Sequence, residues 1–346
     1  MDNLIRMMMM GAAGVADADL GPSSALAVAH QSSPFITIYS RDGDTFTKLD
    51  DPDVLPLNDG GGVAFSNDDT YMAVAHRDSP YITIYKRDGD TFTKLDNPNV
   101  LPSDNGQGVA FSNDDTYMAV AHFSSPYITI YKRNGDTFTK LDNPNVLPSD
   151  NGYGVAFSSD DTYMAVAHSS SPYITIYIRD GDTFTKLDNP NVLPSRTGYG
   201  VAFSSDDTYM AVAHSNSPFI TIYKRNGDTF TKLDNPNVLP PSTGWGVAFS
   251  SDDTYMAVAH NNFPFITIYS RDGDTFTKLD DPDVLPASTG RSVAFSSDDT
   301  YMAVAHQSSP YITIYSRDGD AFTKLDDPDV LPPSTGRSVA FSNTNF

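Results

Sequence analysis

The chain of 346 residues contains no cysteine and no glutamate, and it has a single tryptophan. Without cysteine it can form no disulfide framework, thiol nucleophile or cysteine-ligated metal site, and its redox compartment stays open. The formal net charge of −22 comes from aspartate, which accounts for all 44 acidic residues. Because so acidic a chain repels phosphate groups, we expect no nucleic-acid partner.

Helical periodicity is also missing, and one repeat takes its place. The chain has seven histidines, and they recur every 46 residues: His30, His76, His122, His168, His214, His260 and His306. A unit of this length is close to the roughly 40 to 50 residues of a four-stranded propeller blade. It is longer than the helical ankyrin and tetratricopeptide units.

Each unit contains four short runs of β-branched and aromatic residues, bounded by turn residues. In one unit they are GVAFS (108–112), YMAVAH (117–122), YITIYKR (127–133) and DTFTKLD (136–142). We predict four strands, named a to d. The a–b and c–d connections are tight turns, because Asn-Gly and Asp-Gly accept a positive φ. Prolines such as Pro126 and Pro144 end strand pairing in the b–c and d–a connections.

The two ends of the chain predict how the ring closes. The pattern begins at SALAVAH (24–30), a strand b without a strand a, and ends at GRSVAFSNTNF (336–346), a strand a with nothing behind it. The C-terminal strand therefore joins the first blade, which removes the exposed edges. The sequence predicts an all-β fold, a seven-bladed β-propeller of 46-residue four-stranded repeats over residues 21–346. An N-terminal arm over residues 1–20 precedes it.

The repeat resembles a known family. VAFSSDDTYMAVAHSSSPYITIYIRDGDTF (155–184) is similar to the WD-repeat pattern, in which a strand ending in Phe-Ser and an Asp-containing turn precede two further strands. The resemblance covers residues 25–342 and implies a protein-binding platform with no fixed chemistry. Tyr177 stands where the family has tryptophan, and the family's Gly-His pair before strand a is absent.

The opening segment MDNLIRMMMMGAAGVADADLG (1–21) allows two interpretations. One is a secretory signal, with Arg6, a short apolar run and small residues near Ala16, although Asp2 is unfavourable there. The segment also resembles the openings of many structural proteins of tailed phages, which implies an arm that docks into an assembly. We expect the arm to bind protein subunits of such an assembly, and we expect no membrane insertion.

The repeats can be compared with one another face by face. Because the chain reverses at every connection, the a–b and c–d turns share one face of the disc, and the b–c and d–a connections share the other. On the first, the constant face, the copies hardly differ, with changes such as Asn67 for serine and Asn134 for aspartate. On the second, the variable face, they differ freely.

Large side chains gather at two positions of the variable face. The position before GVAFS or SVAFS and the loop after the histidine together give an aromatic arc facing an arginine arc: Phe123, Tyr153, Tyr199, Trp245 and Phe263 against Arg77, Arg291 and Arg337. Aromatic residues and arginine are enriched at binding hot spots, so these eight residues are the predicted binding site. Drift of exposed loops is the alternative explanation.

Other residue patterns have simpler explanations. A structural role for the histidines, bonded to their own b–c loops, is favoured over a metal site. For the aspartates of the constant face, turn formation is favoured over calcium binding. The chain has no serine elbow and no glycine-rich phosphate loop, and the repeat symmetry looks unbroken inside the channel. We therefore expect no enzyme, no catalytic residue, no cofactor and no metal.

These observations leave functions of different classes. We expect a non-enzymatic structural and recognition protein, a tail or surface component of a phage virion. Its variable face would bind a host-surface protein or a neighbouring subunit. The alternative is a lectin-like glycan-binding propeller, free or secreted by a bacterium. A lactonase-type hydrolase on a similar propeller is a third hypothesis.

Overall fold

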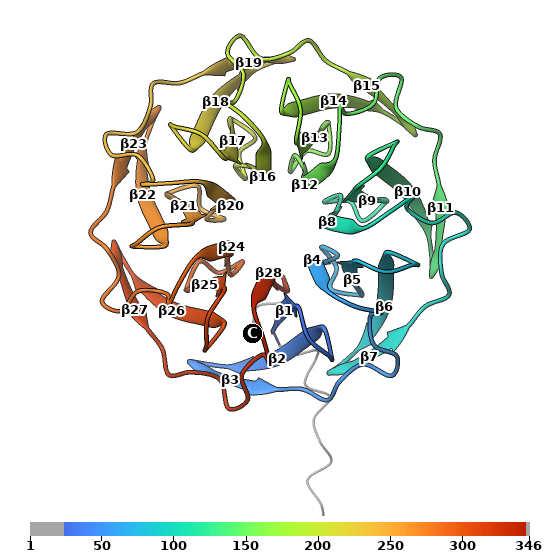
Figure 1. Cartoon of the computed structure of the whole chain (residues 1–346), viewed down its shortest axis with the longest axis horizontal. Coiled ribbons are helices and arrows are strands. Elements are labelled where there is room, and N and C mark those ends of the chain that lie inside the picture. The colour runs from blue at the N-terminus through green and yellow to red at the C-terminus, as the bar shows by residue number, and fades with distance from the viewer. Residues whose placement is uncertain (1–23, 344–346) are drawn as a thin grey trace, which may run out of the picture.

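The computed structural model describes residues 24–343 and is a ring of seven four-stranded antiparallel sheets around a central channel (Figure 1). This confirms the predicted seven-bladed propeller. The predicted arm over residues 1–20 lies outside the described residues. Within residues 24–343 there is no helix with the length and apolar character needed to cross a membrane.

Strands a and b form the inner half of each blade. Strand a lies next to the channel in β28 (Gly336–Phe341), β4 (Gly60–Phe65), β8 (Gly106–Phe111), β12 (Gly152–Phe157), β16 (Gly198–Phe203), β20 (Gly244–Phe249) and β24 (Gly290–Phe295). Strand b follows in β1 (Ala25–His30), β5 (Tyr71–His76), β9 (Tyr117–His122), β13 (Tyr163–His168), β17 (Tyr209–His214), β21 (Tyr255–His260) and β25 (Tyr301–His306).

Strands c and d form the outer half. Strand c is β2 (Ile36–Asp42), β6 (Ile82–Asp88), β10 (Ile128–Asn134), β14 (Ile174–Asp180), β18 (Ile220–Asn226), β22 (Ile266–Asp272) and β26 (Ile312–Asp318). Strand d, at the rim, is β3 (Thr45–Lys48), β7 (Thr91–Lys94), β11 (Thr137–Lys140), β15 (Thr183–Lys186), β19 (Thr229–Lys232), β23 (Thr275–Lys278) and β27 (Ala321–Lys324). Blade 1 is β28-β1-β2-β3, and blades 2 to 7 follow in chain order.

The hydrophobic core lies between neighbouring blades. Successive side chains of a strand point to opposite faces, so β5 turns Ala73 toward blade 3 and Val74 toward blade 1. Each interface packs small alanines and isoleucines of one blade against valine, tyrosine and a methionine of the next, with Leu26 in place of the methionine in blade 1, as Ala73 packs with Val120 and Tyr131. Strand b is therefore buried along its whole length.

The C-terminal strand closes the ring as predicted. β28 pairs antiparallel with β1, with Val339 opposite Val28. The Ser342 hydroxyl accepts a hydrogen bond from the Ala25 amide, and the Ser342 amide donates to the Ala25 carbonyl, both at 2.8 Å. Blade 1 is thus assembled from both ends of the described chain, and β1 has no free edge.

The histidines are structural, but their side-chain partner is not the one expected. Each ring is fully buried, and its Nε2 lies 2.8–2.9 Å from the hydroxyl of a threonine on strand c, as His168 does from Thr175. The ring therefore ties strand b to strand c rather than to the b–c loop. Among the seven, His122 alone also donates from Nδ1 to a loop carbonyl, that of Phe123, at 2.8 Å.

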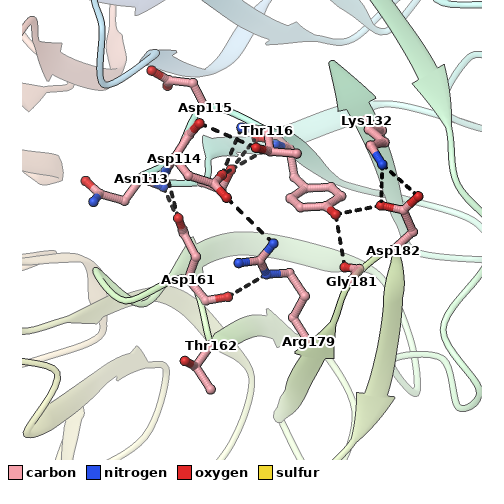
Figure 2. A network of polar contacts seen from close by, with 12 residues as sticks. Asn113, Asp114, Asp115, Thr116, Lys132, Asp161, Thr162, Arg179, Gly181 and Asp182 are labelled. Atoms are coloured by element: carbon pink, nitrogen blue, oxygen red, sulfur yellow. Dashed lines mark hydrogen bonds and ion pairs between the residues drawn. The ribbon is translucent and has the colours of Figure 1, made fainter. Parts of the chain in front are cut away.

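The aspartates of the constant face link blades as well as forming turns. Figure 2 shows one such junction, where the buried Asp161 carboxylate accepts backbone N–H groups of Asn113 and Asp114, at 2.6 and 2.7 Å, from the preceding blade. Arg179 donates from Nε to the Asp161 carbonyl at 2.7 Å and approaches the Asp114 carboxylate at 3.7 Å. The constant face is therefore a repeated polar clasp between blades.

Candidate functional site

The central channel opens on the variable face into a cavity of about 390 Å³. It is lined by Asp59, Gly60, Gly61, Arg77, Asn105, Gly106, Gln107, Phe123, Tyr153, Tyr199, Trp245, Arg291 and Arg337. The structure thus brings together seven of the eight predicted site residues, all except Phe263. Because Gly61 carries no side chain, the cavity reaches the backbone of blade 2.

A β-bulge explains why the variable position faces the cavity. In β12 the pairing with β13 shifts between Gly152 and Gly154, so Tyr153 has no direct partner, and the other inner strands show the same shift. A bulge of this kind re-aims a side chain and is common beside active sites. Glycine after the bulge fits tightly, since a Cβ on Gly154 would come within 2.7 Å of the Tyr199 carbonyl.

The aromatic residues of the cavity pack on one another around the mouth. The ring centroids of Phe123 and Tyr153 are 5.5 Å apart, those of Tyr153 and Tyr199 are 5.1 Å apart, and both pairs meet edge to face. Tyr199 then lies 4.2 Å from Trp245, with the two rings inclined at 35°. Burial raises the pKa of both tyrosines. The four rings form one continuous wall from blade 3 to blade 6.

Phe123 reaches this wall through a loop that differs from its six counterparts. Ser124, which follows it, has φ +59°, whereas the equivalent residues of the other loops are absent from the left-handed region. A left-handed serine is conformationally costly, and such costs concentrate at functional sites. His122 donates to the reoriented Phe123 carbonyl, which stabilises this loop geometry.

Two of the arginines, Arg77 and Arg337, flank one carboxylate. The Asp59 carboxylate lies 3.6 Å from Arg337 and 3.9 Å from Arg77, and its side chain is 21 % exposed. Arg337 also donates to the side-chain oxygen of Gln31. Arg291 stacks on Trp245, with its guanidinium carbon 4.4 Å from the ring centroid. The mouth therefore holds three arginines and one aspartate, an excess of positive charge on a very acidic protein.

Asp59 is the residue that the sequence analysis missed. It looks like one more polar turn residue, but the other six repeats have asparagine or threonine at this position: Asn105, Asn151, Thr197, Thr243, Thr289 and Thr335. Comparison of the repeats at the position before Gly60 would have found it. Among the residues that the structure describes, it is the one acidic residue lining the cavity.

Phe263 is not part of the aromatic wall, which corrects its predicted place beside Trp245. Its side chain is 69 % exposed and contacts the ring of Phe265 at 6.1 Å. The loop residue that contacts Trp245 is Asn261, which accepts a long hydrogen bond from Trp245 Nε1 at 3.4 Å. Phe263 lies two residues further along the loop and does not line the cavity.

No protein-family model and no curated protein matches the sequence. Solved structures match in fold. A Bacteroides fragilis protein assigned as a 6-phosphogluconolactonase gives a TM-score of 0.76 at 12% identity, over 93% of this chain and 98% of its own. A Bacteroides uniformis protein with the same assignment gives 0.76 at 14% identity, over 93% and 100%. The Pseudomonas aeruginosa periplasmic gluconolactonase gives 0.71 at 16% identity, over 92% and 99%.

At these identities the likeness shows the seven-bladed fold of four-stranded repeats. It gives no named WD-repeat or phage relative, and no support for a virion, for host recognition or for lectin function. The same structures contradict the prediction that the chain is not an enzyme, because the proteins that it resembles carry the names of hydrolytic enzymes. The physical reason is that the strands repeat faithfully while the bulged residues at the channel mouth do not.

Proposed function

We propose that the protein hydrolyses the lactone of a sugar acid in the cavity at the channel mouth. The observation that carries the proposal is Asp59, one carboxylate that faces two guanidinium groups at 3.6 and 3.9 Å in a cavity of suitable size. The names of the similar lactonases support the reaction class. A location outside the cytoplasm, as for the periplasmic gluconolactonase, belongs to the same proposal.

Lactone hydrolysis needs a base for water and a positive group for the oxyanion. In the proposed reaction Asp59 accepts a proton from water as the water oxygen bonds to the lactone carbonyl carbon. A guanidinium of Arg337 or Arg77 stabilises the resulting oxyanion. The ring C–O bond then breaks, and the leaving alkoxide takes the proton back from Asp59. The product is the open hydroxy acid, and Asp59 returns to its ionised form.

The surroundings of Asp59 suit this role. Both ion pairs are longer than a direct hydrogen bond, so the carboxylate oxygens keep room for water. The side-chain oxygen of Gln31 also accepts from Arg337, which helps to fix the position of its guanidinium.

The test is hydrolysis of glucono-1,5-lactone, followed by proton release in a pH-stat and corrected for the spontaneous reaction. We expect the full chain to accelerate hydrolysis and Asp59→Asn to reduce kcat/KM by about 100-fold or more, since a general base contributes about that much. Asparagine is tolerated at this position in blades 3 and 4, as Asn105 and Asn151, so the variant should fold normally.

The matched control is Asp150→Asn. Asp150 lies on the same face, bonds the Ser170 hydroxyl at 2.7 Å and does not line the cavity. Blade 2 already has Asn58 at the equivalent position, so the change is again one that the repeat accepts. Wild-type protein that leaves the lactone at its spontaneous rate, or equal rates for Asp59→Asn and Asp150→Asn, would overturn the proposal.

A further inference from the structure

We infer that Arg291 and Arg337 form a subsite for an oxyanion, a carboxylate or a phosphate group that the ligand carries. The assignment of this group to a lactone substrate rests on the proposed function, but the subsite itself does not. It predicts a ligand of a definite class, a sugar derivative that bears an acid group of its own.

Arg291 has no counter-charge among the residues that the structure describes. Its Nε is buried without a hydrogen-bond partner there, and its guanidinium carbon lies 4.4 Å from the centroid of the Trp245 ring. No ion pair joins it to a carboxylate among the described residues. Burial lowers the pKa of Arg291, and so does the neighbouring guanidinium of Arg337. Two arginines brought together in this way lower their mutual repulsion when an anion binds between them.

The constant face shows what a satisfied arginine looks like in the same fold. Arg179 also packs on an aromatic ring, with its guanidinium carbon 5.0 Å from the centroid of Tyr117. Its Nε donates to the Asp161 carbonyl at 2.7 Å, and its Nη1 lies 3.7 Å from the Asp114 carboxylate. Arg291 has the aromatic support but neither acceptor, so its binding capacity remains for a ligand.

The aromatic wall positions this arginine instead of stacking on a sugar. Trp245 belongs to blade 6 and contacts both Tyr199 of blade 5, with ring centroids 4.2 Å apart, and Arg291 of blade 7, with the guanidinium carbon 4.4 Å from its centroid. A glycan stacked on Trp245, as a lectin site would require, would compete with these two contacts. The edges of aromatic rings carry partial positive charge, which also favours an anionic ligand.

The charge of the mouth also favours a substrate that bears an acid group over a neutral one, such as the glucono-1,5-lactone of the hydrolysis assay. A neutral lactone gives an acidic product, and a cavity with three arginines and one aspartate would bind that product more tightly than the substrate. A substrate that already carries an acid group reduces this difference, because substrate and product then share the charge that Arg291 recognises.

The test uses the full chain and four probes at constant ionic strength: glucose, gluconate, glucose 6-phosphate and inorganic phosphate. Binding is read from the fluorescence of Trp245, the single tryptophan, and independently by calorimetry, since changes at Arg291 alter the Trp245 environment themselves. We expect saturable binding of gluconate or of the phosphates and at least tenfold weaker binding of glucose. The relative affinities of gluconate and glucose 6-phosphate tell which oxyanion is preferred.

Two variants locate the subsite. Arg291→Gln copies Gln107 of blade 3 and should weaken anion binding at least tenfold, whereas Arg179→Gln on the constant face should leave it unchanged. Anion binding by a protein that hydrolyses no lactone would support the subsite and remove the proposed function. Glucose binding as tightly as gluconate and the phosphates, absence of saturable anion binding, or undiminished binding by Arg291→Gln would overturn the inference, whatever the hydrolysis assay shows.

Discussion

The two ends of the channel are built from the same strands but differ in how they use charge. At the constant face of blades 3 to 7 the buried aspartate accepts two backbone N–H groups of the preceding blade, and the arginine finds a carbonyl and a carboxylate, as Asp161 and Arg179 do (Figure 2). At the variable face Arg291 has neither partner among the described residues, and Asp59 is the one acidic residue beside three arginines. In these blades the constant face uses its charged groups to join neighbouring blades, whereas the channel mouth leaves Arg291 for a ligand.

The difference shows where a nearly perfect repeat can carry a functional site. A side chain that joins one blade to the next must be repeated, because every junction needs it. The bulged residue of strand a makes no contact that every junction requires, so it varies from Gly61 to Trp245. Stability therefore favours repetition at the constant face, and binding exploits variation at the mouth.

Removal of the closing strand β28 should have the largest effect on the stability of the fold. A chain lacking residues 336–346 loses the buried Val339 and Phe341 and leaves β1 as an open edge. We expect it to aggregate or to melt far below the full chain, as judged by light scattering and thermal unfolding. A synthetic peptide of residues 336–343 should restore part of the loss. A truncated monomer that melts like the full chain would contradict the closure.

Low pH should reduce the stability of the folded state, because every blade contains a buried histidine. Burial lowers the pKa of six of them from 6.5 to about 4: His30, His76, His168, His214, His260 and His306. The folded state keeps these rings neutral while the unfolded chain protonates them, so stability is lost as the pH falls from about 6.5 toward 4. Each proton taken up on unfolding costs about 1.4 kcal/mol per pH unit.

The measurement is the melting temperature between pH 7.5 and 5. We expect a steep fall that corresponds to uptake of several protons on unfolding, whereas a single titrating group would give a shallow one. A melting temperature that stays level across this range would show that the histidines are not held neutral by burial.

A smaller loss should follow from opening one polar clasp. Asp161→Ala leaves the N–H groups of Asn113 and Asp114 without their acceptor, which should reduce the free energy of unfolding by about 3 kcal/mol. Asp180→Asn on the same face copies Asn134 of blade 3 and should change it by less than about 0.5 kcal/mol. Denaturant unfolding compares the two, and equal midpoints would argue against a stabilising clasp.

The sequence predicted the propeller because its evidence is local and repeated. A fixed interval, strand alternation and an incomplete repeat at each end were enough to define the blades and their closure. Comparison of the repeats also found Arg77, Trp245 and Arg291, because large side chains stand out against a constant background.

Contacts between blades could not be predicted in the same way. The partner of Asp161 lies in another repeat, so the clasp looks like an ordinary turn in the sequence. Asp59 is as small and polar as the residues that it replaces, and its importance follows from Arg337, which is distant in sequence. Phe263 was misplaced because sequence position gives the loop but not the direction of a side chain within it.

The most direct test of a functional site at the channel mouth is to replace its distinctive charged residues by those of another blade. A variant with Asp59→Asn, Arg291→Gln and Arg337→Gln carries at each site the residue of blade 3, Asn105 or Gln107. Its melting temperature and its hydrolysis of glucono-1,5-lactone are measured beside those of the unchanged chain. We expect melting to stay within a few degrees and hydrolysis to fall to the spontaneous rate. A variant that still hydrolyses the lactone as fast as the unchanged chain would contradict the assignment of function to the channel mouth.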